Sequence, residues 1–353
     1  MSPSGRWTVA SETLVTLVLA VAGGVVAEAL RIPVGFIMGS SLAVGIAGLC
    51  GVRVGMPNWL RDAAFVLTGV VLGTNVARES LQLLGQWPVT LAALVVELVI
   101  IIAGTGWVLR RVFRMDSGTA YLSSFPGHLS FVMGIAAAGI GNARQIMVIQ
   151  VIRVMMLTIV VPIAAIFVPI GEYAGISRGE PMGWHTLAII VAVCAVVGFV
   201  FTRLRIPAGY ALGAMLTATA AKLGGMLEGT MPPVAMAVAF VMIGAVIGAR
   251  FRGITMAEFR SAAAGGLVGT AIVFAAATFV SIVAAQFVDM PFGQIWIGLA
   301  PGALESMAAM GVALGFDPAF VAAHHVARLL LLTFAIPVIA LLVRDKKPEP
   351  GAE

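Results

Sequence analysis

The sequence carries an internal duplication, which restricts its possible folds more than any other feature. LRIPVGFIMGSSL at 30–42 recurs as LRIPAGYALGAML at 204–216, with an offset of 174 residues. Two more matches have an offset of 175, pairing 68–76 with 243–251 and 125–163 with 300–338. Pro, Gly and Arg recur in place within these matches. A nearly constant offset of this kind indicates two copies of one structural unit.

Apolar runs of about 20 residues recur along both copies, and each is long enough to cross a ~30 Å hydrocarbon core. The chain has 353 residues, of which 60% are hydrophobic and 10% are charged. A soluble domain carries about 25% charged residues. The 41 glycines suit closely packed membrane helices. We therefore predict an all-α polytopic membrane protein surrounded by membrane lipid.

Each copy is expected to contain the same series of helices. The first repeat spans 12–170, the second spans 184–344, and the polar segment 171–183 is predicted to link them. Pro33 and Pro207 are expected at the first helical position, which tolerates a missing N–H. Helices are predicted near 12–30, 34–51, 59–77, 88–109, 144–168, 184–203, 208–227, 233–250, 263–287, 294–315 and 318–343, with a broken segment near 118–140.

Positive charge in the loops indicates how the repeats are oriented, because cytoplasmic loops are enriched in Lys and Arg. If the broken segment of each repeat is a re-entrant hairpin, each repeat crosses the membrane five times and the two are inverted. Thirteen basic residues then lie in the cytoplasm and four outside, and both termini are cytoplasmic. If the segment crosses fully, this bias largely disappears, so we predict two inverted repeats with ten crossings and two re-entrant hairpins. The thirteen are Arg53, Arg61, Arg110, Arg111, Arg114, Arg203, Arg205, Arg250, Arg252, Arg260, Arg344, Lys346 and Lys347; the four are Arg31, Arg78, Arg178 and Lys222.

Equivalent apolar runs are interrupted at Pro126-Gly127 and at Pro301-Gly302. Inverted repeats with interrupted helices are typical of secondary transporters. The N–H groups freed at the start of a half-helix can bind an anion, and freed carbonyls can bind a cation. The alternative is that each Pro-Gly pair is a packing kink. We predict that the two interruptions contribute to one binding site.

Two buried arginines occupy matching positions in the last helix of each repeat. Arg153 and Arg328 each lie about ten residues beyond an expected cap, at Asn142 or Asp317. Ionisable groups at this depth usually face a bundle interior or a cavity. Either the arginines contact an anion or clamp the hairpins, or they form structural ion pairs such as Arg328 with Glu305, or they snorkel outward.

Other ionisable residues are further candidates. Glu305 follows Pro301 at a hairpin tip, where a site should form, and His128 lies near the opposite tip. His324 and His325 are adjacent; His325, like Gln150 in the first repeat, precedes the arginine by three residues and shares its face. One histidine could carry protons, with helix packing as the alternative. Glu97, whose counterpart Ile272 is apolar, is either a proton carrier or a neutral carboxyl group bonded to another helix.

The RIPxGxxxG motif at 31–39 and 205–213, together with APGALESMAAMGVALGFDPAFVAAHHVARLL, resembles the AbrB family of bacterial membrane proteins. The resemblance covers nearly the whole chain. It implies a duplicated membrane fold related to inverted-repeat antiporters and carboxylate symporters, in the bacterial inner membrane. Members are described as transporters, as regulators of gene expression or as ammonia monooxygenases. FPGHLSF in the first repeat replaces the acidic APGALES, so only one hairpin is expected to carry a glutamate.

Three function classes follow from these features. The favoured one is a secondary transporter of a small, anionic solute, coupled to H⁺ or Na⁺. A membrane regulator is the alternative, although the tail RDKKPEPGAE is too short for a DNA-binding domain. A membrane enzyme would need several convergent ligands, and four histidines, two of them adjacent, suit this poorly. We predict no enzyme, cofactor, bound metal or nucleic-acid partner, and, by analogy with related carriers, a homodimer.

Overall fold

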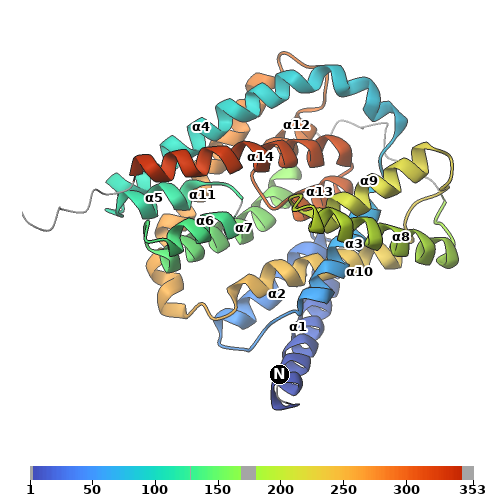
Figure 1. Ribbon diagram of the computed structural model, residues 1–353, viewed down its shortest axis with the longest axis horizontal. Helices are drawn as coiled ribbons and strands as arrows, with labels where there is room; N and C mark the ends of the chain where they lie inside the picture. Colours follow the sequence, from blue (N-terminus) through green and yellow to red (C-terminus); the bar gives the residue numbers. More distant parts are fainter. Residues whose placement is uncertain (1–2, 128, 168–179, 344–353) are drawn as a thin grey trace, which may run out of the picture.

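The computed structural model describes residues 3–127, 129–167 and 180–343, and these residues form an all-α bundle (Figure 1). The two sequence repeats give the same series of elements in the same order. The first contains α1 (Pro3–Ala29), α2 (Gly35–Leu49), α3 (Asn58–Thr74), η1 (Arg78–Gln86), α4 (Trp87–Arg111), α5 (Ser117–Ser124), α6 (Leu129–Ala137) and α7 (Ala143–Ala165). The second contains α8 (Trp184–Arg203), α9 (Gly209–Leu223), α10 (Pro233–Gly248), η2 (Ala249–Phe251), α11 (Met256–Ala284), α12 (Phe292–Leu299), α13 (Leu304–Ala313) and α14 (Pro318–Val343).

Seven helices in the described ranges are long and apolar enough to cross a membrane, namely α1, α4, α7, α8, α10 with η2, α11 and α14. Large apolar side chains such as Leu14, Phe279 and Phe334 are exposed along them. This confirms the polytopic membrane fold. Helices α2, α3 and α9 have 15, 17 and 15 residues, fewer than the ~20 needed for a perpendicular crossing. The count of ten crossings remains a prediction.

The contacts between the two repeats are reciprocal. Helix α2 packs on α10, and their counterparts α9 and α3 pack on each other in the same way. Helix α4 contacts its own counterpart α11, and α3 contacts α10. A two-fold relation between the repeats requires this exchange of partners. We still predict, rather than observe, that the repeats are inverted across a membrane.

The matching RIPxG motifs adopt one unusual backbone conformation. Arg31 and Arg205 have φ angles of 56° and 60°, in the left-handed region that residues with side chains rarely enter. The residues after the prolines, Val34 and Ala208, have φ angles of 55° and 52°. The same strained turn in both copies supports the duplication at the level of single backbone angles.

These turns correct the expected role of Pro33 and Pro207. Neither proline occupies the first helical position, because the left-handed residue after it separates it from the helix. The helices begin at Gly35 and Gly209, where a Cβ atom would lie 2.8 Å from the Glu28 amide nitrogen or 2.6 Å from that of Thr202. The motif therefore turns the chain sharply and brings the next helix against the previous one.

Glycines also allow the first two helices of each repeat to cross closely. A Cβ atom added to Gly39 of α2 would lie 2.1 Å from the Gly23 carbonyl oxygen of α1. At the matching crossing of α8 and α9, a Cβ atom on Gly213 would lie 2.7 Å from the Cα atom of Gly198. Small residues let membrane helices approach closely enough for extensive van der Waals contact.

The predicted interruptions are confirmed. Helix α5 ends at Ser124 and α6 begins at Leu129, so Pro126 and Gly127 lie in the break. Pro301 and Gly302 lie in the equivalent break between α12 and α13. Helix α14 runs past both breaks and contacts α5 and α6 as well as α12 and α13 (Figure 1).

Two elements differ from the sequence prediction. Helix α11 begins at Met256 rather than near 263, because Thr255 and Glu258 form a capping box at its start. The 3₁₀ segment η1 was not expected. Helix α7 begins after Asn142, whose side chain accepts a hydrogen bond from the Gln145 amide, as predicted. The Asp317 side chain likewise accepts one from the Ala319 amide at the start of α14.

The inverted topology can be tested by cysteine labelling in a background lacking Cys50 and Cys194. A cysteine at Ser177, which lies in the predicted linker and outside the described residues, should react with an impermeant reagent from the periplasmic side. One at Arg114 should react only from the cytoplasm, because with a re-entrant hairpin only the helix predicted near 144–168 crosses the membrane between Arg114 and the linker. Labelling of both positions from the same face would contradict inversion.

Candidate functional site

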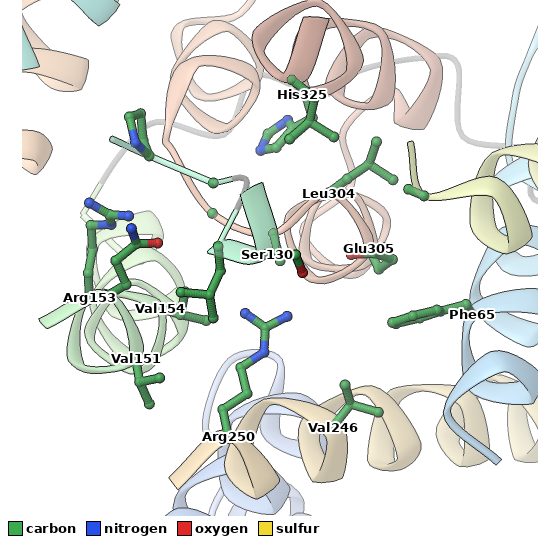
Figure 2. A pocket seen from close by; sticks show the side chains of 18 of the residues that line it. Phe65, Ser130, Val151, Arg153, Val154, Val246, Arg250, Leu304, Glu305 and His325 are labelled. Atoms are coloured by element: carbon green, nitrogen blue, oxygen red, sulfur yellow. The ribbon is translucent and has the colours of Figure 1, made fainter. Parts of the chain in front are cut away.

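A cavity of about 570 Å³ lies where the two repeats meet, beside both helix interruptions. Figure 2 shows side chains from both halves of the chain converging on it. Eight of the residues predicted from the sequence line this one cavity: Pro126, Gly127, Arg153, Pro301, Gly302, Glu305, His325 and Arg328. His128, predicted at the first hairpin tip, lies outside the described residues.

Arg153 on α7 clamps the end of α5. Its guanidinium donates hydrogen bonds to the carbonyl oxygens of Ser123 at 3.1 Å and Phe125 at 2.6 Å. These are the carbonyls that the last turn of a helix leaves without partners. A cation there also compensates the negative end of the helix dipole. The buried charge thus stabilises the interrupted backbone.

Arg328 makes the same arrangement in the second repeat. Its guanidinium donates to the carbonyls of Ala300 at 3.2 Å and Gly298 at 3.3 Å, and also to that of Leu299, at the end of α12. It is 1% exposed. Within the described ranges, Arg328 and Glu305 form no ion pair. The sequence left several roles open for the two arginines. The hydrogen bonds that they form are those expected of a clamp on the hairpins.

Gln150 and His325 lie one turn before the arginines and share their faces, as expected. The Gln150 amide donates to the Leu122 carbonyl oxygen at 3.2 Å. In His325, Nδ1 lies 2.9 Å from the Val321 carbonyl oxygen, while Nε2 has no partner among the described residues. The His325 ring is 2% exposed and lines the cavity. A cavity-lining ring of the second repeat thus has an unpaired nitrogen among the described residues, at the position where the first repeat has Gln150.

His324 and Glu97 do not line the cavity. His324 is held among aromatic rings, with Nε2 2.7 Å from the Thr90 hydroxyl and Nδ1 2.9 Å from the Phe320 carbonyl. Glu97 on α4 is fully buried, and neither carboxyl oxygen has a hydrogen-bond partner in the described parts of the chain. Arg328 is the charged group within electrostatic range of it. The expected bond from Glu97 to a neighbouring helix is therefore not seen there.

Arg250 is the site residue that the sequence interpretation missed. It was assigned only to the cytoplasmic charge bias, yet from η2 it points into the cavity toward Ser130 and Glu305 (Figure 2). It has no ion-pair or hydrogen-bond partner among the described residues, although Glu305 and Arg61 lie within electrostatic range. Its counterpart in the first repeat is Asn75. The sequence signal for this role was that a charged residue, Arg250, stands where the other repeat has a neutral one.

The cavity is strongly cationic. Five arginines and one glutamate line it. Arg61 pairs with Asp62 at 2.9 Å and Arg252 with Glu12 at 2.8 Å; these arginines are 43% and 58% exposed and mark the cavity mouth. The guanidinium groups of Arg153 and Arg328 already donate hydrogen bonds to backbone carbonyls. The remaining lining arginine is Arg250, opposed by Glu305 in the first turn of α13.

The described residues contain no group of three or more His, Cys, Asp or Glu side chains arranged to hold a metal ion. Cys50 is exposed and Cys194 is buried, and neither forms a disulfide. The cavity lining offers guanidinium groups from both repeats, the His325 imidazole, the Glu305 carboxyl group and backbone N–H groups at the start of α13.

Comparison with known proteins places the chain within one family. A family model described as "Transition state regulatory protein AbrB" matches residues 1–82 and 36–344. The chain is 24% identical over 333 residues to a protein of Escherichia coli (strain K12) named "Putative regulator AbrB", covering 92% of this chain and 94% of that protein. It is 22% identical over 355 residues to "Uncharacterized protein YhjN" of Bacillus subtilis (strain 168), covering 91% and 90%.

Proposed function

The chain belongs to the AbrB family, and from that premise we propose that it is a secondary transporter of a small anion, coupled to H⁺ or Na⁺. The substrate site is the cavity between the repeats. The observation that carries this proposal is the Arg250 guanidinium, which projects into the cavity with no partner of its own in the described residues. A planar guanidinium matches carboxylate or other oxyanion groups with two parallel hydrogen bonds.

Unequal burial of duplicated positions supports transport. Met56 and Phe65 line the cavity and are half-buried, whereas their counterparts Met231 and Phe240 are 3% and 5% exposed. The same positions are thus accessible from the cavity in the first repeat and closely packed in the second. A carrier that exposes its site alternately to the two sides of a membrane needs two such arrangements.

The test is a thermal-shift measurement on the purified full chain with acetate, succinate and sulfate. A ligand that binds the folded state raises its stability in proportion to its affinity. Replacing Arg250 with Gln should weaken anion binding roughly 10–100-fold, the value of a lost charge-assisted hydrogen bond. The matched control is Arg260→Gln, because Arg260 is exposed and lies outside the cavity.

Binding by the wild type and by the Arg260 variant, with loss in the Arg250 variant, is the expected pattern. Reconstituted vesicles should then accumulate the stabilising anion in a proton or sodium gradient. The proposed site would be contradicted if no anion stabilised the wild type or the Arg260 variant. It would also be contradicted if the Arg250 variant responded to anions like the wild type. Binding without movement of the anion across the vesicle membrane would contradict transport.

The family description and the name of the Escherichia coli relative favour a membrane regulator as the second candidate. A sensor would use the same cavity to bind its ligand, so anion binding alone does not separate the two. Transcript levels in cells carrying the Arg250→Gln protein separate them. A change in transcripts that persists when transport is absent would favour the regulator.

A further inference from the structure

The two adjacent histidines have different hydrogen bonds, and this difference identifies one of them as a proton site. Both nitrogens of His324 are engaged, by the Thr90 hydroxyl and the Phe320 carbonyl. His325 forms one hydrogen bond, between Nδ1 and the Val321 carbonyl oxygen, and the carbonyl group of Ala300 also lies near its ring. A carbonyl can only accept, so Nδ1 carries the hydrogen and Nε2 of the neutral ring keeps its lone pair. That lone pair belongs to a cavity-lining ring and has no partner among the described residues.

We propose that His325 carries the coupling proton of this protein, so that the anion and one proton enter the cavity together. The proposal rests on the proposed function and chooses H⁺ rather than Na⁺ as the coupling ion. The step is a simple protonation: an N–H bond forms at Nε2 with a proton from water on the open side of the cavity. The proton returns to water when the anion leaves.

The charges around His325 explain why the two events should depend on each other. Arg328 lies one turn away on the same helix, and Arg153 and Arg250 line the same cavity. Arg328, the nearest of these cations, repels a further positive charge on the imidazole while the cavity is empty. A bound anion reverses that effect, and a protonated His325 in turn attracts the anion.

The remaining titratable groups near His325 come from several elements. His324 lies on α14 itself, Glu97 comes from α4, Glu305 from α13 and Arg61 from α3, with Arg252 after η2. Helices α5, α6 and α12 carry no charged side chain in their described residues, and Tyr121 of α5 packs against Gly106 of α4. Among the described residues that line the cavity, Glu305 is the competing proton acceptor.

The experiment measures proton uptake when acetate or succinate binds to the purified full chain. Titration calorimetry in buffers of different ionisation enthalpy gives the number of protons taken up per anion, above the range in which the ligand itself titrates. The expected result is one proton per anion at neutral to alkaline pH. Anion affinity should fall about tenfold for each pH unit over that range, as linkage to a single proton requires.

The decisive variant is His325→Gln, because glutamine is the residue that the protein itself has at the matching position, Gln150. It should fold and bind acetate with no proton uptake and with an affinity independent of pH. His185→Gln is the control: His185 is exposed at the start of α8, and its variant should behave like the wild type. Glu305→Gln should retain proton uptake.

Undiminished proton uptake by the His325 variant would overturn the proposal, as would loss of uptake in the Glu305 variant alone. Anion binding by the wild type without any proton uptake would overturn this inference and leave the proposed anion site standing. A wild type that binds none of the probe anions at any pH would overturn the proposed function, and this inference with it.

Discussion

Replacing Arg328 with Met is expected to destabilise the folded protein by about 3–5 kcal/mol. The guanidinium is 1% exposed and donates to three consecutive carbonyls at the end of α12. Methionine fills a similar volume but donates nothing, so these carbonyls lose their partners where water does not reach them. The loss should appear as a fall in the thermal unfolding midpoint of the purified protein.

Companion variants test whether the hydrogen bonds from Arg328 to the end of α12 account for this loss of stability. The stability of Arg328→Lys should lie between those of the wild type and Arg328→Met, because lysine keeps the charge but lacks the planar guanidinium group. Arg153→Met should be destabilised in the same way through the carbonyls of Ser123 and Phe125. The double variant Glu305→Gln, Arg328→Met should be no more stable than Arg328→Met alone. A double variant with restored stability and a normal anion response would instead show that Arg328 pairs with Glu305.

Replacing Gly39 with Ala is expected to give the second large destabilisation, for a steric reason. The added Cβ atom would lie 2.1 Å from the Gly23 carbonyl oxygen, and backbone on both sides cannot give way as a side chain can. Helices α1 and α2 must separate, which loses contact along the whole crossing; overpacking of this kind costs about 1–3 kcal/mol and sometimes more. Urea or detergent unfolding of the purified variant measures the loss.

Gly134→Ala is the matched control for that variant. Gly134 lies inside α6, and a Cβ atom added there meets no atom within 4 Å. The same substitution should therefore be neutral or stabilising by about 0.4–1 kcal/mol, since alanine restricts the unfolded chain more than glycine does. Equal effects at Gly39 and Gly134 would show that the close crossing does not limit stability.

Most of the fold could be predicted from the sequence because hydrophobic length, duplication and helix breakers are local signals. The breaks at Pro126 and Pro301 and the caps at Asn142 and Asp317 all lie where these signals placed them. The start of α2 did not follow the usual rule for proline. Its position depends on the left-handed Val34 and on the close contact of Gly35 with α1, which are tertiary effects.

The candidate site could be predicted only in part. Matching positions indicated that Arg153 and Arg328 belong together, but which groups they would contact depends on where α5 and α12 end in space. Arg250 was interpreted as a loop charge because it directly follows an apolar helix, and only the packing of η2 turns it into the cavity. The sequence places His325 on the same helix face as Arg328, but which of the adjacent histidines has an unpaired nitrogen depends on their hydrogen-bond partners in space.

The short helices α2, α3 and α9 have a consequence for the lipid around the protein. Their 15 to 17 residues span about 22–26 Å, less than the ~30 Å hydrocarbon layer of an average bilayer. Each presents a large apolar side chain outward, at Ile46, Trp59 and Leu216. Where these helices cross the membrane as predicted, we expect hydrophobic mismatch to thin the bilayer beside them, at a cost of a fraction of a kcal/mol per Å. The protein is therefore matched best to a thin membrane, or to one whose acyl chains can shorten locally around it.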